Sequence, residues 1–262
     1  MLTSPKMTLP NGAIAPARLY LFDNEHKIRQ IDAEKGTQLK EINLDKLTRG
    51  KMDPGRSHMT LAPDGNTLLV TDFSVKPLFW DTRKWEAGLA PALQRLNTPR
   101  TLEHVTFSHD SKIAAQYFIG RLSIWNYKSG QDIRAFDTLN VHRVELIPEA
   151  SVVLVDEGGS KIRALNYNTG KELWNERLHG ANRFVVYATI PKSPALVSAG
   201  NDGSIRVTEA SSFNEAAKWL IDPGQSASLI AVSPDGKFAA TFHLNPSLIR
   251  LWALPTVVAK KR

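Results

Sequence analysis

The chain has 262 residues, of which 42% are hydrophobic and 23% charged, and its 33 Lys and Arg outnumber its 26 Asp and Glu to give a net charge of +7. This composition excludes low-complexity disorder, and the absence of cysteine excludes disulfides and thiolate metal sites. The sequence has no apolar run of membrane-spanning length, so we expect no transmembrane helix. Only AKKR at 259–262 concentrates cations, which does not favour a nucleic-acid surface.

In chain order, an apolar strand followed by a turn of the Pro-Asp-Gly kind recurs six times. Asn-Gly and Asp-Gly pairs tolerate the positive φ that a tight turn requires. The segments are MTLPNG at 7–12, MTLAPDG at 59–65, VTFSHDS at 105–111, VELIPEA at 144–150, YATIPKS at 187–193 and IAVSPDG at 230–236. Each predicts the first strand of a repeated unit and the turn that ends it.

A second segment follows each of these turns at nearly constant spacing. The segments are KIRQID at 27–32, PLFWDT at 77–82, LSIWNY at 122–127, KIRALNY at 161–167, SIRVTEA at 204–210 and LIRLWAL at 248–254. Equivalent positions are Ile31, Trp80, Trp125, Leu165, Thr208 and Trp252, separated by 49, 45, 40, 43 and 44 residues. This regularity predicts a tandem repeat of roughly 44 residues.

Two further short runs complete each unit, one between the two segments and one after a polar turn. Examples are SVVLVDE at 151–157 and NTGKELWNERL at 168–178. We label the four strands of a unit a to d in chain order. Sustained helical periodicity is absent, and LDKLTRG at 44–50 predicts one short helical turn.

Four-stranded units of this length are typical of the blades of a β-propeller. We therefore expect an all-β fold, a six-bladed β-propeller of four-stranded antiparallel blades, with a fragment of a seven-bladed propeller as the alternative. The whole chain, 1–262, is then a single domain. The approximate blades are 1–50, 51–97, 98–139, 140–179, 180–223 and 224–262.

SAGNDGSIRVTEA at 198–210, SPDG at 233–236 and FWDT at 79–82 resemble the WD-repeat family. This resemblance implies a structural network in which an Asp of the b–c turn bonds a His before strand a and a hydroxyl on strand b. Carried over, the residues are Asp202, His179 and Ser198, with Thr208 in place of the family's Trp. NTGKELW at 168–174 is also similar to the turn of quinoprotein-like propellers.

Catalytic motifs are missing from the sequence. The seven histidines form no metal-binding pair, and neither a nucleophile elbow nor a nucleotide-binding glycine loop is present. We therefore predict no catalytic residue, no cofactor and no metal site. Trp80, Trp125 and Trp252 share one repeat position on strand c and are expected in the core between blades, whereas Trp85 and Trp174 are expected to be partly exposed.

The leading functional prediction is a non-enzymatic protein–protein interaction scaffold. Its d–a and b–c loops bring cations, imidazoles and aromatics to one rim, residue types that often dominate interfaces. The candidate partner-binding residues are Arg56, His58, Arg100, His104, His142, Arg143, Arg183, Phe73, Tyr117 and Phe118. An acidic or mixed-charge protein segment is the expected partner, although the b–c carboxylates can instead pair with the arginines themselves.

Two other functions stay open: a quinoprotein-like enzyme with a site at the channel mouth, and a basic propeller that binds nucleic acid. The first residues lack the apolar core of a signal peptide, which favours a cytoplasmic protein. An unseen upstream leader is the alternative.

Overall fold

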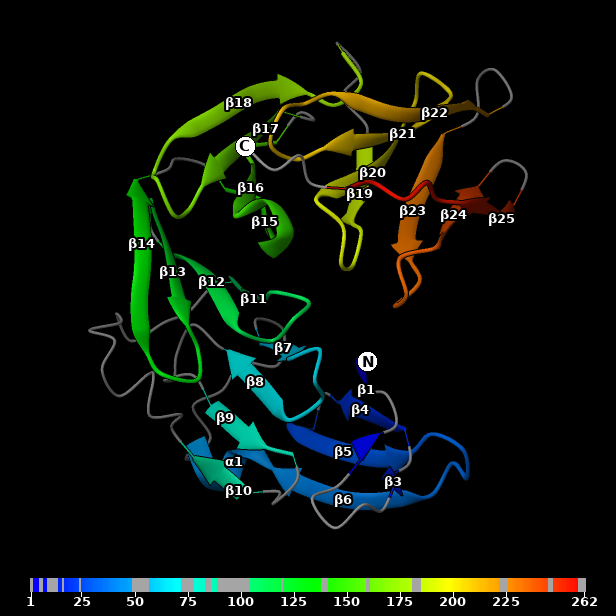
Figure 1. Cartoon of the computed structure of the whole chain (residues 1–262). Helices are drawn as coiled ribbons and strands as arrows, with labels where there is room; N and C mark the ends of the chain where they lie inside the picture. The colour runs from blue at the N-terminus through cyan, green and yellow to red at the C-terminus, as the bar shows by residue number, and fades with distance from the viewer. Residues whose placement is uncertain are drawn as a thin grey trace. The chain divides into compact units, whose positions relative to one another are not determined.

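A computed structural model describes most of the chain (Figure 1). The described residues are 2–4, 7–8, 14–15, 17–23, 25–48, 57–71, 78–82, 86–88, 104–118, 120–137, 141–158, 161–180, 185–221, 226–244 and 247–258. They belong to two compact units, which we treat separately. Unit 1 comprises 1–119 and 123–132, and unit 2 comprises 120–122 and 133–262.

The structure is almost entirely antiparallel sheet. The first two sheets lie in unit 1, and the third has residues in both units. The first contains β1 (Leu2–Ser4), β4 (Arg18–Phe22), β5 (Lys27–Asp32) and β6 (Gln38–Asn43), and is followed by the predicted helical turn α1 (Leu44–Thr48). The second contains β7 (His58–Leu61), β8 (Thr67–Thr71), β9 (Leu78–Asp81) and β10 (Glu86–Gly88). The third contains β11 (His104–Phe107), β12 (Ile113–Phe118), β13 (Arg121–Asn126) and β14 (Gln131–Asp137).

Unit 2 contains the remaining three large sheets. The fourth has β15 (Arg143–Ile147), the short 3-10 helix η2 (Pro148–Ala150), β16 (Val152–Asp156), β17 (Lys161–Asn166) and β18 (Glu172–Arg177). The fifth has β19 (Val185–Thr189), β20 (Ala195–Gly200), β21 (Ser204–Glu209) and β22 (Glu215–Leu220). The sixth has three strands instead of the expected four, β23 (Ala227–Val232), β24 (Phe238–Leu244) and β25 (Ser247–Ala253).

The predicted repeat is visible in the backbone hydrogen bonds. Two residues after the equivalent position on strand c, an N–H donates to the carbonyl of the residue that precedes strand b. The donors are Ala33, Thr82, Tyr127, Tyr167, Ala210 and Leu254. The a–b turns also close as expected, with positive φ at Gly65, Ser111, Ser151 and Gly236. Each of the six repeats therefore joins strand c to strand b in the same way.

The first unit of the repeat departs from the prediction. The MTLPNG segment was expected to supply strand a, but its Met7–Thr8 forms β2 and pairs with β3 (Ile14–Ala15) in a separate two-stranded sheet. On the side of β4 away from β5, the neighbouring strand is β1, with Leu2 opposite Tyr20.

The core lies between neighbouring sheets within each unit. Trp80 and Trp125 are each 1% exposed. Trp80 packs with Tyr20 of the first sheet and Leu68 of its own, and Trp125 packs with Leu69 of the second sheet. Leu68 and Leu69 are neighbours on β8 but belong to different clusters, so this strand packs on both faces of its sheet.

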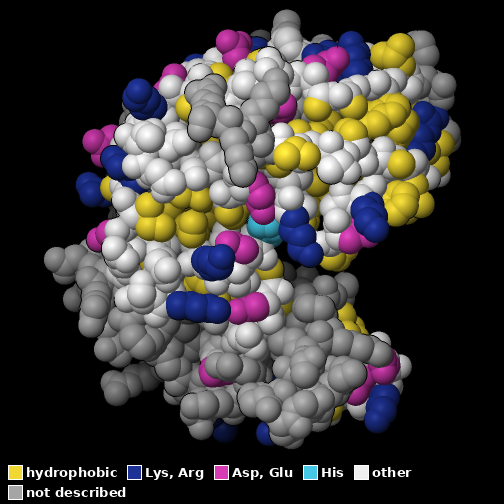
Figure 2. Space-filling model, in the orientation of Figure 1, with side chains coloured by type: hydrophobic (Ala, Val, Ile, Leu, Met, Phe, Trp, Pro, Cys, Tyr) yellow, Lys and Arg dark blue, Asp and Glu magenta, His cyan; other side chains and the backbone are white. Residues whose placement is uncertain are grey.

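The sixth sheet differs from the others in two respects. Trp252 is only partly buried, because β25 is the outermost strand of this sheet among the described residues. Large apolar side chains of this sheet are also exposed, Leu229 by 64%, Ile249 by 70% and Leu251 by 74%. Figure 2 shows hydrophobic side chains gathered at the upper right, where Figure 1 places β22 to β25.

The only α-helix of the described residues is α1, and none of the described helices is long and apolar enough to cross a membrane.

Candidate functional site

Several of the predicted partner-binding residues cannot be placed. Arg56, Phe73, Arg100 and Arg183 lie outside the described residues. His104 and Phe118 belong to β11 and β12, but only their backbone is described. His104 faces the half-buried Tyr117 across the β11–β12 ladder, and His58 is exposed at the start of β7.

His142 and Arg143 are exposed at the start of β15. Arg143 donates from Nε to Glu145 at 2.9 Å and from Nη1 to the Tyr187 carbonyl at 3.0 Å. Its guanidinium lies 4.7 Å from the centre of the Tyr187 ring. Tyr187 is buried, and this burial raises the pKa of its phenol, so the ring is a neutral platform beneath the cation.

His142 is held beside the b–c turn of the same sheet. Its backbone N–H donates to the Asp156 carbonyl at 2.8 Å. Gly158 has φ +87°, and a Cβ at this position would lie 2.8 Å from His142 Nε2. The d–a and b–c loops of the fourth sheet therefore meet, and we call His142, Arg143, Asp156, Glu157 and Gly158 the unit-2 rim.

The carboxylates of the b–c turns pair with an arginine on strand c. Arg29 Nη1 lies 2.8 Å from Asp23, and Arg163 Nη1 lies 3.0 Å from Glu157. Arg206 Nη2 lies 2.7 Å from Asp202. In the sequence, the strand-c arginines are marked by an Ile-Arg pair, which recurs at 28–29, 162–163, 205–206 and 249–250. The arginine of each of these pairs lies on strand c, so the alternative in which the carboxylates pair with the candidate rim arginines stays a prediction.

The three residues implied by the WD-repeat resemblance come together in the fifth sheet. His179 Nδ1 lies 2.9 Å from Asp202 Oδ1, and His179 Nε2 lies 3.0 Å from Ser198 Oγ. Because a carboxylate only accepts, Nδ1 carries the proton and the Ser198 hydroxyl donates to Nε2. Burial lowers the pKa of His179, so the ring is neutral. Thr208, the fourth position, is buried on strand c.

An Asp–His–Ser series of this kind also occurs in hydrolases, where the hydroxyl attacks a substrate. Here Ser198 is 0% exposed and His179 is 2% exposed. A substrate carbonyl cannot reach the hydroxyl without the fifth sheet opening. The arrangement therefore satisfies buried polar groups and ties the d–a loop to strand b and the b–c turn.

The sixth sheet holds its buried imidazole in a different way. Trp252 Nε1 donates to Thr241 Oγ1 at 2.9 Å, and Thr241 Oγ1 lies 2.9 Å from His243 Nε2. Ladder register makes Thr241 equivalent to Ser198, because they face Arg250 and Arg206 respectively. His243, two residues further along strand b, thus supplies the imidazole that the d–a loop supplies in the fifth sheet.

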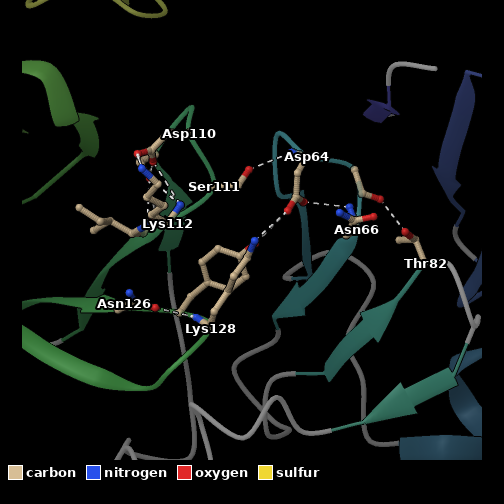
Figure 3. A network of polar contacts seen from close by, with 12 residues as sticks. Asp64, Asn66, Thr82, Asp110, Ser111, Lys112, Asn126 and Lys128 are labelled. Atoms are coloured by element: carbon tan, nitrogen blue, oxygen red, sulfur yellow. Dashed lines mark hydrogen bonds and ion pairs between the residues drawn. The ribbon is translucent and has the colours of Figure 1, made fainter. Parts of the chain in front are cut away.

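Polar contacts also join the a–b and c–d turns within unit 1 (Figure 3). Asp64 lies in the β7–β8 turn, and its backbone N–H donates to Ser111 Oγ at 2.8 Å. Its carboxylate lies 3.5 Å from Lys128 Nζ and 3.4 Å from Tyr127 Oη. These turns belong to the second and third sheets and lie at the strand ends opposite the d–a and b–c loops. The contacts brace neighbouring sheets.

Among the described residues, no group of three or more His, Asp or Glu is placed to hold a metal ion.

Comparison with known proteins bears on the fold. No protein-family model matches the sequence, and no curated protein matches it. Among solved structures, the chain is similar to the crystal structure of the RRP9 WD40 repeats, with 16% sequence identity and a TM-score of 0.61. The similarity covers 90% of this chain and 72% of that one. Together with the six sheets of three or four antiparallel strands, it shows that the chain has the WD40-repeat β-propeller fold.

Proposed function

We propose that the chain is a non-enzymatic scaffold that binds a protein segment at the rim formed by its d–a and b–c loops. The observation that carries the proposal is Arg143, whose side chain is 46% exposed although Glu145 and the Tyr187 carbonyl hold its guanidinium in place. An exposed arginine that is already ordered over an aromatic ring loses little entropy when it binds a partner. Arginine is also among the residues that most often dominate interface energies.

The expected partner segment is acidic or of mixed charge. His142 and Arg143 present donors, while Glu157 and Asp156 in the adjoining turn present acceptors. Arg163 forms an ion pair with Glu157 and offsets part of its negative charge, so the unit-2 rim repels an acidic segment less. The overall charge of +7 attracts acidic surfaces at a distance. The cytoplasmic location that the sequence favours stays a prediction.

The test is a pull-down with a double variant, His142→Ala with Arg143→Ala. We expect recovery of the partner, measured by quantitative mass spectrometry, to fall at least about fivefold. The matched control is Lys112→Ala with Lys128→Ala, which removes two exposed cations from the opposite turns. Circular dichroism and thermal melts check that both variants fold.

The same experiment extends to the rim arginines that lie outside the described residues. Replacing Arg56, Arg100, Arg143 and Arg183 together with Ala should abolish recovery. Partner recovery that is equal in wild type and both rim variants would show that binding occurs elsewhere.

A further inference from the structure

The hydrogen bonds of Arg143 occupy most of its donors. Its Nε donates to Glu145 Oε1 at 2.9 Å, and its Nη2 lies 2.6 Å from the same oxygen. Its Nη1 donates to the Tyr187 carbonyl at 3.0 Å. An arginine that recognises a carboxylate of a partner commonly does so through two neighbouring N–H groups at once. Here Glu145 occupies the edge formed by Nε and Nη2, so a second carboxylate finds that edge closed.

Negative charge beside Arg143 also disfavours a further carboxylate. Burial opposes the charge of the guanidinium, but the carboxylates of Glu145 and Asp156 favour it, and the pKa of Arg143 is raised. Asp156 belongs to the b–c turn whose backbone also holds His142. A carboxylate brought to Arg143 would be repelled by both acidic side chains at short range. The acidic residues of a partner segment therefore suit other positions on the rim than Arg143.

The face of the guanidinium that points away from Tyr187 is the surface that Arg143 offers to a partner. The guanidinium lies over the Tyr187 ring, 4.7 Å from its centre, and the Arg143 side chain is still 46% exposed. Glu145 and the Tyr187 carbonyl hold its nitrogens, so the group is fixed in orientation. A planar guanidinium stacks on aromatic rings through its faces, which leaves hydrogen bonds in its plane intact.

Apolar surface lies on the same side of β19. Val185 is two residues before Tyr187 and nearer the d–a loop, and residues two apart on a strand share a face of the sheet. Its side chain is partly buried against the cluster that also contains Tyr187. A ring is the type of side chain that suits both surfaces, because its face attracts a cation and its carbon skeleton packs on apolar groups.

We infer that the partner segment places an aromatic side chain on the exposed face of Arg143, so that the guanidinium lies between that ring and Tyr187. The bonds from Arg143 to Glu145 and to the Tyr187 carbonyl stay in place, so binding breaks no ion pair. Acidic residues of the segment flank the aromatic one, where the net charge of +7 attracts them. This inference rests on the proposed function and names the side chain that the unit-2 rim recognises.

The probe is an acetylated nine-residue peptide with Phe at its centre and two Asp residues on each side, and its matched forms carry Leu, Glu or Lys at the centre. Titration of the isotope-labelled full chain, followed by NMR, gives the dissociation constants and observes the Arg143 Nε–H signal. We expect the Phe peptide to bind about fivefold more tightly than the Leu peptide. Only the Phe peptide should shift the Arg143 Nε–H proton upfield, because that proton then lies above the face of a ring.

Arg143→Lys separates stacking from charge. A lysine keeps the positive charge beside Glu145 but has no planar group, so the preference for Phe over Leu should fall below about twofold. The matched control is Arg163→Lys, the same change at a strand-c arginine that Glu157 and Glu172 hold. This control should leave the preference unchanged.

Equal binding of the Phe and Leu peptides, or tightest binding of the Glu or Lys peptide, would overturn the inference. If binding without such a preference still falls in the rim variant, His142→Ala with Arg143→Ala, the proposed function stands and only the aromatic contact is ruled out. Saturable binding that is equal in the wild type and the rim variant would count against both. Absence of saturable shifts with all four peptides would also overturn the inference, and the pull-down then decides the proposed function by itself.

Discussion

At the scale of single residues, the fifth and sixth sheets show two ways to place one imidazole. In the fifth sheet, His179 enters from the d–a loop, and a Cβ at Gly200 would lie 2.5 Å from His179 Cγ. In the sixth sheet, the position equivalent to Gly200 is His243 itself. Glycine on strand b is therefore required where the histidine comes from outside the strand.

This relationship predicts a strong coupling between Gly200 and His179. Gly200→Ala should lower the free energy of unfolding by about 2 kcal/mol, because the methyl group displaces the imidazole from Ser198 and Asp202. In a His179→Ala background the same change should cost no more than about 0.5 kcal/mol. Urea denaturation of the double-mutant cycle measures both values. Equal costs in the two backgrounds would disprove the steric link.

Both buried imidazoles should make stability sensitive to mild acid. Burial lowers the pKa of His179 and of His243. Above about pH 6.5 both rings are neutral in the folded and unfolded chains and contribute no pH dependence. Below it, the unfolded chain binds protons that the folded chain does not, so the free energy of unfolding falls as the pH falls.

Denaturation at pH 7.5, 6.5 and 5.5 tests this prediction above the range in which carboxylates titrate. Stability should drop between pH 6.5 and 5.5, and the drop should shrink in His179→Gln with His243→Gln. An identical drop in the double variant would assign the effect to other groups.

At the scale of single elements, strand c carries much of the packing. Trp80 and Trp125 are each 1% exposed between two sheets, whereas Trp252, on a strand with no described outer neighbour, is partly exposed. Trp174 on strand d was expected to be partly exposed, but it is 9% exposed. Its Nε1 donates to the Ala210 carbonyl at 2.7 Å, and its ring packs on Phe213. The c–d turn of the fifth sheet covers the Trp174 ring, and the sequence around Trp174 does not predict this contact.

The strand-c tryptophans should therefore contribute different amounts to the free energy of unfolding. Trp80→Ala and Trp125→Ala should each lower the free energy of unfolding by roughly 3–5 kcal/mol. Trp252→Ala should cost less, because part of the ring already meets solvent. Guanidinium denaturation followed by circular dichroism gives the three values. A larger loss for Trp252→Ala than for the other two would mean that β25 is covered more fully than in the structure.

At the scale of the whole molecule, the repeat determines which turns share one end of the strands. Each four-stranded sheet places its a–b and c–d turns at one end of the strands and its d–a and b–c loops at the other. Braces such as the Asp64 network occupy the first end, whereas the unit-2 rim lies at the second. Loops on a rigid sheet scaffold are where binding residues concentrate.

The absence of catalysis is a prediction for the purified protein. We expect no hydrolase activity, because Ser198 and His179 are buried in the sheet and a substrate cannot reach them. We also expect no visible chromophore. A co-purifying quinone, seen in the absorption spectrum, would support the quinoprotein-like alternative.

Nucleic-acid binding is tested by retention on immobilised DNA. With cations spread along the sequence, we expect weak retention that is lost by physiological salt. Tight retention with a steep salt dependence would favour the nucleic-acid alternative instead.

The amino-acid sequence by itself determined the β-propeller class, the positions of most turns and the identity of the strand-c tryptophans. These features follow from local chemistry, because alternation, Asp-Gly turns and a constant period are written along the chain. The number of blades stays a prediction.

Only the tertiary structure decided which polar groups meet. The pairing of Arg163 with Glu157, the stacking of Arg143 on Tyr187 and the burial of Trp174 join residues of different strands or sheets. Such contacts depend on ladder register and on how neighbouring sheets stack, and a shift of one residue reverses every side chain. The sequence also did not predict that the sixth sheet has three described strands, because strand pairing depends on which segments meet in space.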